Sequence, residues 1–208
     1  HHGKPILELA DLCELLGACP EELLRLESTL DDGVRGIYLN RPVREGDLIL
    51  RVPLDACLMD DEPPEWWTRA KEEQDNGDDH FTSFSYNNPS DWAPRLAAAL
   101  IDLQLQQLQH PREKGKDKIE EGKALWLSFL PNPAYLRASL PVHWGETVLR
   151  DARCTALELA VDSSYFARAE AVADLMMGLQ NYCPIAKDIP AKDLERLCHN
   201  ALDVVQTR

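Results

Sequence analysis

One stretch, residues 31–54, constrains the fold of this chain more than any other. It contains two short apolar runs, 37–39 and 48–52, which are rich in the β-branched and aromatic residues that favour strands. Between them, Pro42 has no N–H to give to a ladder, and Gly46 is free to adopt the positive φ of a tight turn. The pattern predicts an antiparallel hairpin in which the two runs pair with each other.

The hairpin extends into a small antiparallel β-region over about residues 33–59, with a third short strand at 56–59. Apolar residues at helical spacing dominate the rest of the chain. The fold class expected is therefore α+β, a small antiparallel β-region followed by a mostly helical insert. We expect N-terminal helices over 1–27, a β-hairpin region over 28–60, an acidic loop over 61–90 and a helical region over 91–208.

The acidic loop contains two adjacent tryptophans. Residues 60–79 carry nine acidic and two basic side chains, with Pro63-Pro64 and Asn76-Gly77 as loop signals. Trp66 and Trp67 are too large and apolar to remain in water. They either pack back against the chain or anchor a partner protein, and we favour packing.

Composition narrows the class of partner and the compartment. A net charge of −14 over 208 residues argues against a nucleic-acid-binding surface, and no apolar run is long enough to span a membrane. The six cysteines include no C-x-x-C pair and no cluster of Cys and His with metal-ligand spacing. Reduced thiols in the cytoplasm, nucleus or chloroplast stroma explain them best, and the sequence does not choose among these compartments.

Several short motifs in the same stretch resemble those of a known protein family. The run D-G-V-R-G-I at 32–37, the run R-P-V-R-E-G-D at 41–47 and the V-P that closes the second apolar run at 52–53 resemble the opening of a SET domain. The most similar group is that of the plant Rubisco large-subunit methyltransferase, which includes the actin-histidine methyltransferase. The chain would then hold the opening half of a SET domain and its helical insert.

Later segments extend this resemblance over roughly residues 28–208. L-A-A-A-L-I-D-L at 96–103 is similar to a leucine-rich helix of the family, and A-L-W-L-S-F-L-P at 124–131 with L-P-V-H-W at 140–144 is similar to its aromatic segment. The latter departs from the family at Ser128-Phe129, where the family has proline and tyrosine. The run L-D-V-V-Q-T-R at 202–208 is similar to the end of the family's helical insert.

The resemblance implies S-adenosylmethionine as cofactor and N-methylation of a protein lysine or histidine as reaction. No catalytic residue is assigned, because the family's asparagine-histidine motif and channel tyrosine have no match in these 208 residues; His199-Asn200 has the reverse order inside a predicted helix. We therefore expect no methyl transfer from the 208 residues alone. The cofactor-binding candidates implied are Gly33, Val34, Arg35, Gly36 and Arg208.

Two alternatives stay open. The glycines at 33 and 36 also suit a plain β-hairpin, in which they only permit a turn. The chain also fits a non-catalytic, SET-derived binding or scaffold subunit whose open face is covered by a protein partner. Other catalytic readings are weaker, since the sequence has no G-x-S-x-G, P-loop or H-E-x-x-H, and nothing favours pairing His143 with a cysteine.

Overall fold

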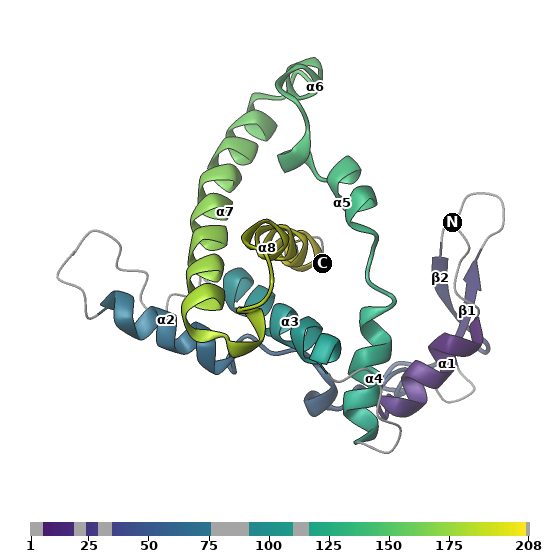
Figure 1. Cartoon of the computed structure of the whole chain (residues 1–208). Coiled ribbons are helices and arrows are strands. Elements are labelled where there is room, and N and C mark those ends of the chain that lie inside the picture. The colour runs from purple at the N-terminus through teal and green to yellow at the C-terminus, as the bar shows by residue number, and fades with distance from the viewer. Residues whose placement is uncertain (1–5, 19–23, 29–34, 76–91, 110–116, 207–208) are drawn as a thin grey trace. The chain divides into compact units, whose positions relative to one another are not determined.

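The computed structural model of the chain describes residues 6–18, 24–28, 35–75, 92–109 and 117–206 (Figure 1). It divides into two compact units. The first comprises residues 1–57 and 112–129, and the second comprises 58–111 and 130–208. Each unit is described by itself below.

The first unit pairs two helices and a short ladder. Helix α1 (Ile6–Leu15) packs on α4 (Lys118–Leu127), where a Cβ added to Gly122 would lie 2.6 Å from Cδ2 of Leu16. Gly17, at φ 63°, ends α1 in the left-handed conformation that glycine tolerates. Asp117 begins α4, because its carboxylate accepts the N–H of Ile119 at 3.1 Å. The turn η1 (Leu54–Ala56) also lies against α4.

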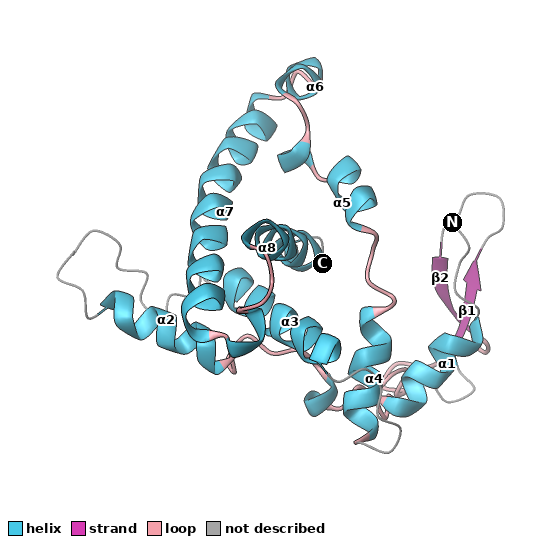
Figure 2. Ribbon diagram, viewed as in Figure 1, coloured by secondary structure: helices cyan, strands magenta, loops and turns pink. Residues whose placement is uncertain are grey.

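The strand at 37–39 pairs with a different segment from the one predicted. Strand β2 (Arg35–Leu39) confirms a strand at 37–39, but it pairs with β1 (Leu24–Ser28), drawn in magenta in Figure 2. The pairing is antiparallel, with Leu24 opposite Leu39. Residues 48–50 form no strand, and Leu48 is 66% exposed. The predicted turn is present, because Gly46 has φ 92° and the N–H of Asp47 donates to the carbonyl of Arg44 at 3.1 Å.

The predicted α+β fold class is therefore wrong: the described residues are overwhelmingly helical, and their architecture is all-α apart from this two-stranded ladder. In the described part of 33–59, the expected β-region is reduced to β2 and the single bridge residue Arg51, and residues 54–56 form η1. The physical reason is the sequence of β1, Leu-Arg-Leu-Glu-Ser, whose apolar and polar residues alternate with the period of a strand. Residues 24–27 of β1 lie where N-terminal helices were expected, and β1 supplies the partner that 48–52 was expected to supply.

The second unit is built around helix α8 (Ala191–Gln206), which appears at the centre of Figure 1. Helices α3, α5 and α7 all contact it. These helices follow the helical periodicity of the sequence, with short 3-10 turns where prolines interrupt it. The elements of this unit are α2 (Glu65–Asp75), α3 (Trp92–Gln109), α5 (Pro133–Ser139), η3 (Pro141–His143), α6 (Glu146–Asp151), α7 (Thr155–Tyr182), η4 (Pro184–Ala186) and α8.

Small side chains bring α3 and α8 close together. Ala97 and Ala98 on α3 are fully buried, as is Ala201 on α8. Larger residues complete the core around them, since Ile101 and Leu202 are also fully buried. Close approach of two helices through alanines allows these leucines and isoleucines to interdigitate at high density.

Within residues 61–90, where an acidic loop was expected, the structure has helix α2 at 65–75; residues 76–90 lie outside the described residues. Trp66 and Trp67 are 5% and 2% exposed, so they pack back on the chain as favoured. The indole N–H of Trp66 donates to a carboxylate oxygen of Asp102 on α3 at 3.0 Å. These tryptophans therefore leave almost no surface with which to anchor a partner.

Replacing Gly178 with valine is expected to destabilise the second unit by about 1–3 kcal/mol, the usual effect of overpacking a core. Gly178 lies on α7 where α2 crosses it, and a Cβ there would lie 2.9 Å from Cε3 of buried Trp66 and 3.4 Å from Cβ of Ala70. Urea denaturation followed by tryptophan fluorescence measures the change in free energy of unfolding.

Gly145→Ala is the matched control, because a Cβ at that position meets nothing within 4 Å. An unchanged denaturation midpoint for Gly178→Val would contradict the packing of α2 on α7.

Candidate functional site

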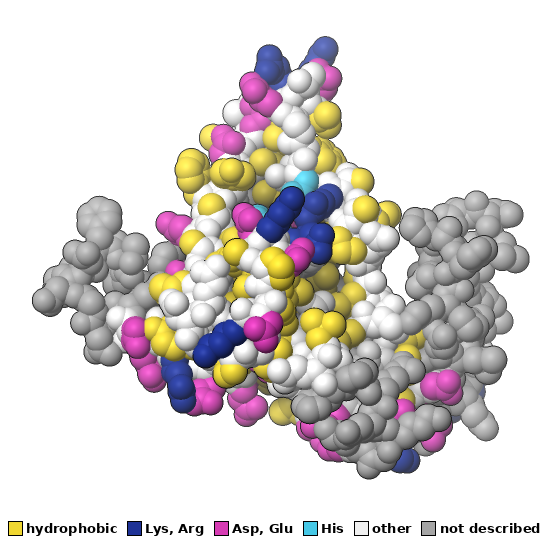
Figure 3. All heavy atoms as spheres, in the orientation of Figure 1, with side chains coloured by type: hydrophobic (Ala, Val, Ile, Leu, Met, Phe, Trp, Pro, Cys, Tyr) yellow, Lys and Arg dark blue, Asp and Glu magenta, His cyan; other side chains and the backbone are white. Residues whose placement is uncertain are grey.

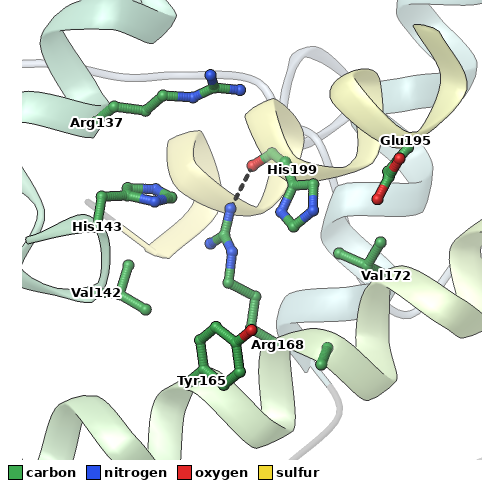
Figure 4. A pocket seen from close by; sticks show the side chains of 9 residues that line it. Arg137, Val142, His143, Tyr165, Arg168, Val172, Glu195 and His199 are labelled. Carbon is green, nitrogen blue, oxygen red and sulfur yellow. Dashed lines mark hydrogen bonds between the residues drawn. The ribbon is translucent and has the colours of Figure 1, made fainter. Parts of the chain in front are cut away.

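A cavity of about 590 Å³ opens in the second unit between α5, η3, α7 and α8 (Figure 4). Its wall combines charged and aromatic side chains with a few small apolar ones. The volume lies in the range of small-molecule sites, about 300–1,000 Å³. The lining residues are Arg137 from α5, Val142 and His143 from η3, Tyr165, Arg168, Ala169 and Val172 from α7, and Glu195 and His199 from α8.

Helical spacing explains why these side chains meet. Tyr165, Arg168 and Val172 are three and four residues apart, so they share one face of α7. Glu195 and His199 share a face of α8 in the same way. Figure 4 shows these two faces turned toward the same space, with the side chains of η3 and α5 on the opposite side.

A buried ion pair lies beneath the cavity. Asp203 on α8 is fully buried and Arg168 is 4% exposed. Their closest atoms, Asp203 Oδ1 and Arg168 Nη2, are 2.7 Å apart. Arg168 Nη2 also donates to the carbonyl of His199 at 2.7 Å, the dashed line in Figure 4, and Nη1 donates to the side-chain oxygen of Gln206 at 3.2 Å. One guanidinium therefore fixes the last two turns of α8 to α7.

The same carboxylate also holds a histidine. Nε2 of His143, on η3, is 2.8 Å from Oδ1 of Asp203. The imidazole is partly exposed at the cavity wall, whereas the carboxylate is inaccessible to water. Asp203 thus connects three segments, α7, α8 and η3, through a single oxygen atom.

Burial and neighbouring charges shift the acid–base properties of this cluster. Burial lowers the pKa of Arg168 from its ordinary value, while the adjacent carboxylate of Asp203 opposes that effect and Arg137 reinforces it. Burial also lowers the pKa of His199, and Arg168 lowers it further. Glu195 and Asp203 act in the opposite direction on His199, and Arg137 lowers its pKa slightly more.

Arg137 differs from Arg168 in having no carboxylate beside it. It is exposed at the cavity mouth, and within the described residues it forms no ion pair. Figure 4 places its guanidinium over the same space as Arg168, His143 and His199, with Glu195 on the far wall. Several cationic or protonatable groups therefore face one cavity in a chain whose net charge is −14.

Periodicity did not reveal this cluster. Arg168 occupies a position of the buried stripe of α7, which continues at Ala171, Val172 and Leu175, and Asp203 lies within the buried run 201–205 of α8, whose other residues are apolar. A charged residue inside each apolar stripe was the available signal, because two such charges are buried together only when they pair.

The structure describes two of the five cofactor-binding candidates. Arg35 and Gly36 lie in β2, opposite Ser28 and Glu27 of β1. Gly33, Val34 and Arg208 lie outside the described residues, although α8 ends at Gln206, close in sequence to Arg208. Residues 33–36 belong to the first unit and Arg208 belongs to the second.

The cysteines and the possible metal ligands form no further site among the described residues. Cys13, Cys57, Cys154, Cys183 and Cys198 are free thiols. Burial raises the pKa of Cys198 to about 12, so this thiol is protonated and unreactive at neutral pH. Among the residues that the structure describes, no three His, Cys, Asp or Glu side chains gather where they would hold a metal ion.

Comparisons with protein-family models, with curated proteins and with solved structures found no match to this chain. Across the described helices, none is both long and apolar enough to cross a membrane.

Replacing Asp203 with leucine is expected to reduce the free energy of unfolding by about 3–5 kcal/mol, because Arg168 would stay buried without its carboxylate. The double variant Arg168→Met/Asp203→Leu is expected to recover most of that loss, since it fills the space with apolar atoms and leaves no unpaired guanidinium. Chemical denaturation of the wild type, both single variants and the double variant measures the coupling between the two residues.

Arg150→Ala supplies the control, because it removes an exposed pair with Glu146 that contributes at most about 1 kcal/mol. Simple additivity of the two single losses in the double variant would contradict the pairing of Arg168 with Asp203.

The imidazole of His199 is expected to titrate below the ordinary value of about 6.5. Since its folded pKa is lowered, its contribution to stability is present above that value and is lost as the pH falls through the folded pKa. The Cε1–H signal of His199 in NMR spectra recorded against pH measures the midpoint.

Arg137→Gln should raise this midpoint and Glu195→Gln should lower it, because the two charges act on His199 in opposite directions. Arg196→Gln, an exposed change on α8, is the matched control. Shifts of equal sign in the Arg137 and Glu195 variants would contradict this geometry.

Proposed function

We propose that this chain supplies the glycine-rich opening segment and the helical insert of an S-adenosylmethionine-dependent protein N-methyltransferase that acts on lysine or histidine. The proposal rests on motifs that resemble the family and occur in the same order, from 32–37 to 202–208. The structural support is the series of helices within 92–109 and 117–206 and the anchoring of α8 by the buried Arg168–Asp203 pair. This anchor holds the turn of α8 that leads to Arg208.

The residues present suit a cofactor that carries a carboxylate and an amine. Gly36 lies in β2, which pairs with β1 along one edge. Glycine at 33 and 36 lets a ligand approach the backbone closely. The planar guanidinium of Arg208 is suited to hold a carboxylate with two parallel hydrogen bonds. The bound cofactor would supply the methyl group.

Protein is the partner class that we propose, either as substrate or as a subunit, and nucleic acid is not, given the net charge of −14. The second candidate is a binding or scaffold subunit without catalysis. The exposed apolar side chains of α6 and α7 favour it, since Val148, Leu159 and Phe166 are 53%, 65% and 70% exposed. Such a subunit would bind a protein and no cofactor.

Calorimetric titration of S-adenosylmethionine into the chain tests the proposal. Weak binding is expected, and Arg208→Ala should weaken it by about tenfold or more, the usual result of losing a charged hydrogen-bonding partner. Arg196→Ala removes an exposed arginine of the same helical region and should leave the affinity unchanged. Equal affinities for wild type and Arg208→Ala would remove Arg208 from the site, and no binding at all would favour the scaffold candidate.

A further inference from the structure

The cavity beside Arg168 has an excess of hydrogen-bond donors. Arg137 offers five N–H groups, Arg168 offers a buried Nε–H, and His199 and Tyr165 line the same wall. In Figure 3 one group of Lys and Arg side chains lies beside a histidine on the face over α8, with acidic side chains next to it; further Lys and Arg side chains lie at the top and in the lower part of the view. A chain with net charge −14 thus concentrates cationic groups at one hollow.

Carboxylates of the chain neutralise only part of the positive charge at this cavity. Asp203 offsets Arg168 from beneath, at 2.7 Å, and is itself fully buried, so it lines no part of the cavity. Arg137 faces Arg168 and His199 with charge of the same sign, and it lowers the pKa of both. Glu195 sits on the opposite wall from Arg137 (Figure 4). An anion between the two guanidinium groups would relieve their repulsion.

The buried Nε–H of Arg168 also favours an acceptor in this cavity. Within the described residues, Nε of Arg168 has no hydrogen-bond partner, although the residue is only 4% exposed and both of its terminal nitrogens donate. Buried N–H groups are nearly always satisfied by protein, water or ligand, so an orphaned one at a cavity wall marks a place for an acceptor.

We propose that this cavity binds a phosphate monoester, whose phosphate group is held by Arg137, Arg168 and His199. A phosphate offers three terminal oxygens that accept hydrogen bonds, and the planar fork of arginine matches two of them at once. A carboxylate has two oxygens and would leave more of these donors unsatisfied. None of the residues that line the cavity is a cofactor-binding candidate, and the proposal does not depend on the proposed methyltransferase function.

The rest of the cavity wall specifies an organic ester over free phosphate. A volume of about 590 Å³ far exceeds one phosphate ion. Val142 on one side of the cavity and Ala169 and Val172 on the other add apolar surface, and the ring of Tyr165 also lines the cavity. These groups suit the carbon portion of the ester, which gains affinity by leaving water, while Glu195 on the far wall disfavours a second anionic group there.

Calorimetry on the whole chain with phenyl phosphate, inorganic phosphate and benzoate tests the proposal. Phenyl phosphate should bind most tightly, and its binding should weaken as salt is raised, because the contact is between charges. Arg137→Gln should weaken it by about ten- to a hundredfold, the usual effect of losing a charge-assisted contact, with Arg196→Gln as the unaffected control. Arg137 is exposed, so its replacement leaves the core intact.

A second readout comes from His199, whose NMR titration midpoint should rise when phenyl phosphate is added, since a bound anion favours the imidazolium. Equal affinity of the wild type and Arg137→Gln would overturn the site. Benzoate binding as tightly as phenyl phosphate would overturn the choice of phosphate, and inorganic phosphate binding as tightly would overturn the organic portion. Affinity for S-adenosylmethionine should not change in Arg137→Gln, which separates this site from the proposed cofactor site.

Discussion

The second unit depends on one buried interaction, the contact of Arg168 with Asp203. Moving two opposite charges out of water is costly, and it is offset only when further hydrogen bonds satisfy both groups. Here the guanidinium also donates to a backbone carbonyl and to Gln206, and the carboxylate also holds His143. These bonds make α7, η3 and the end of α8 a single cooperative cluster. Removing Arg168 or Asp203 alone leaves the other as an unpaired buried charge.

Around this cluster, apolar packing follows the sequence closely. The helical spacing of Leu194, Leu197, Ala201, Leu202 and Val205 predicts the buried stripe of the last helix, and all of them are buried except Leu197, which is half-buried. The alanines of α3 allow α8 to approach closely, since Ala97 and Ala98 are fully buried and α3 contacts α8. Such features are predictable because helical spacing and side-chain size are local properties of the chain.

Other features depend on distant partners and were not predictable in the same way. The strand at 37–39 was identified from its residues, but its partner was chosen wrongly, because two segments of similar strand character flank it and long-range pairing decides between them. Arg168 was overlooked because a charged residue is normally assigned to the surface. Its burial follows from the carboxylate of Asp203, a full helix away in sequence. The helix at 65–75 was masked by acidic composition, although Trp66 and Trp67 supplied its buried face.

Arg168 and Arg137 have different roles in the proposed binding of an anion. Asp203 keeps Arg168 ordered and cancels much of its charge, so Arg168 provides direction: a fixed N–H at a fixed place in the wall. Arg137 stands in contact with solvent without an ion pair among the described residues, so it provides the net positive charge that attracts the ligand. Because an exposed side chain can change without disturbing the core, selection can tune affinity at Arg137 while the buried pair preserves the fold. Structural and ligand-binding roles are therefore separable at this site, although both use the same chemical group.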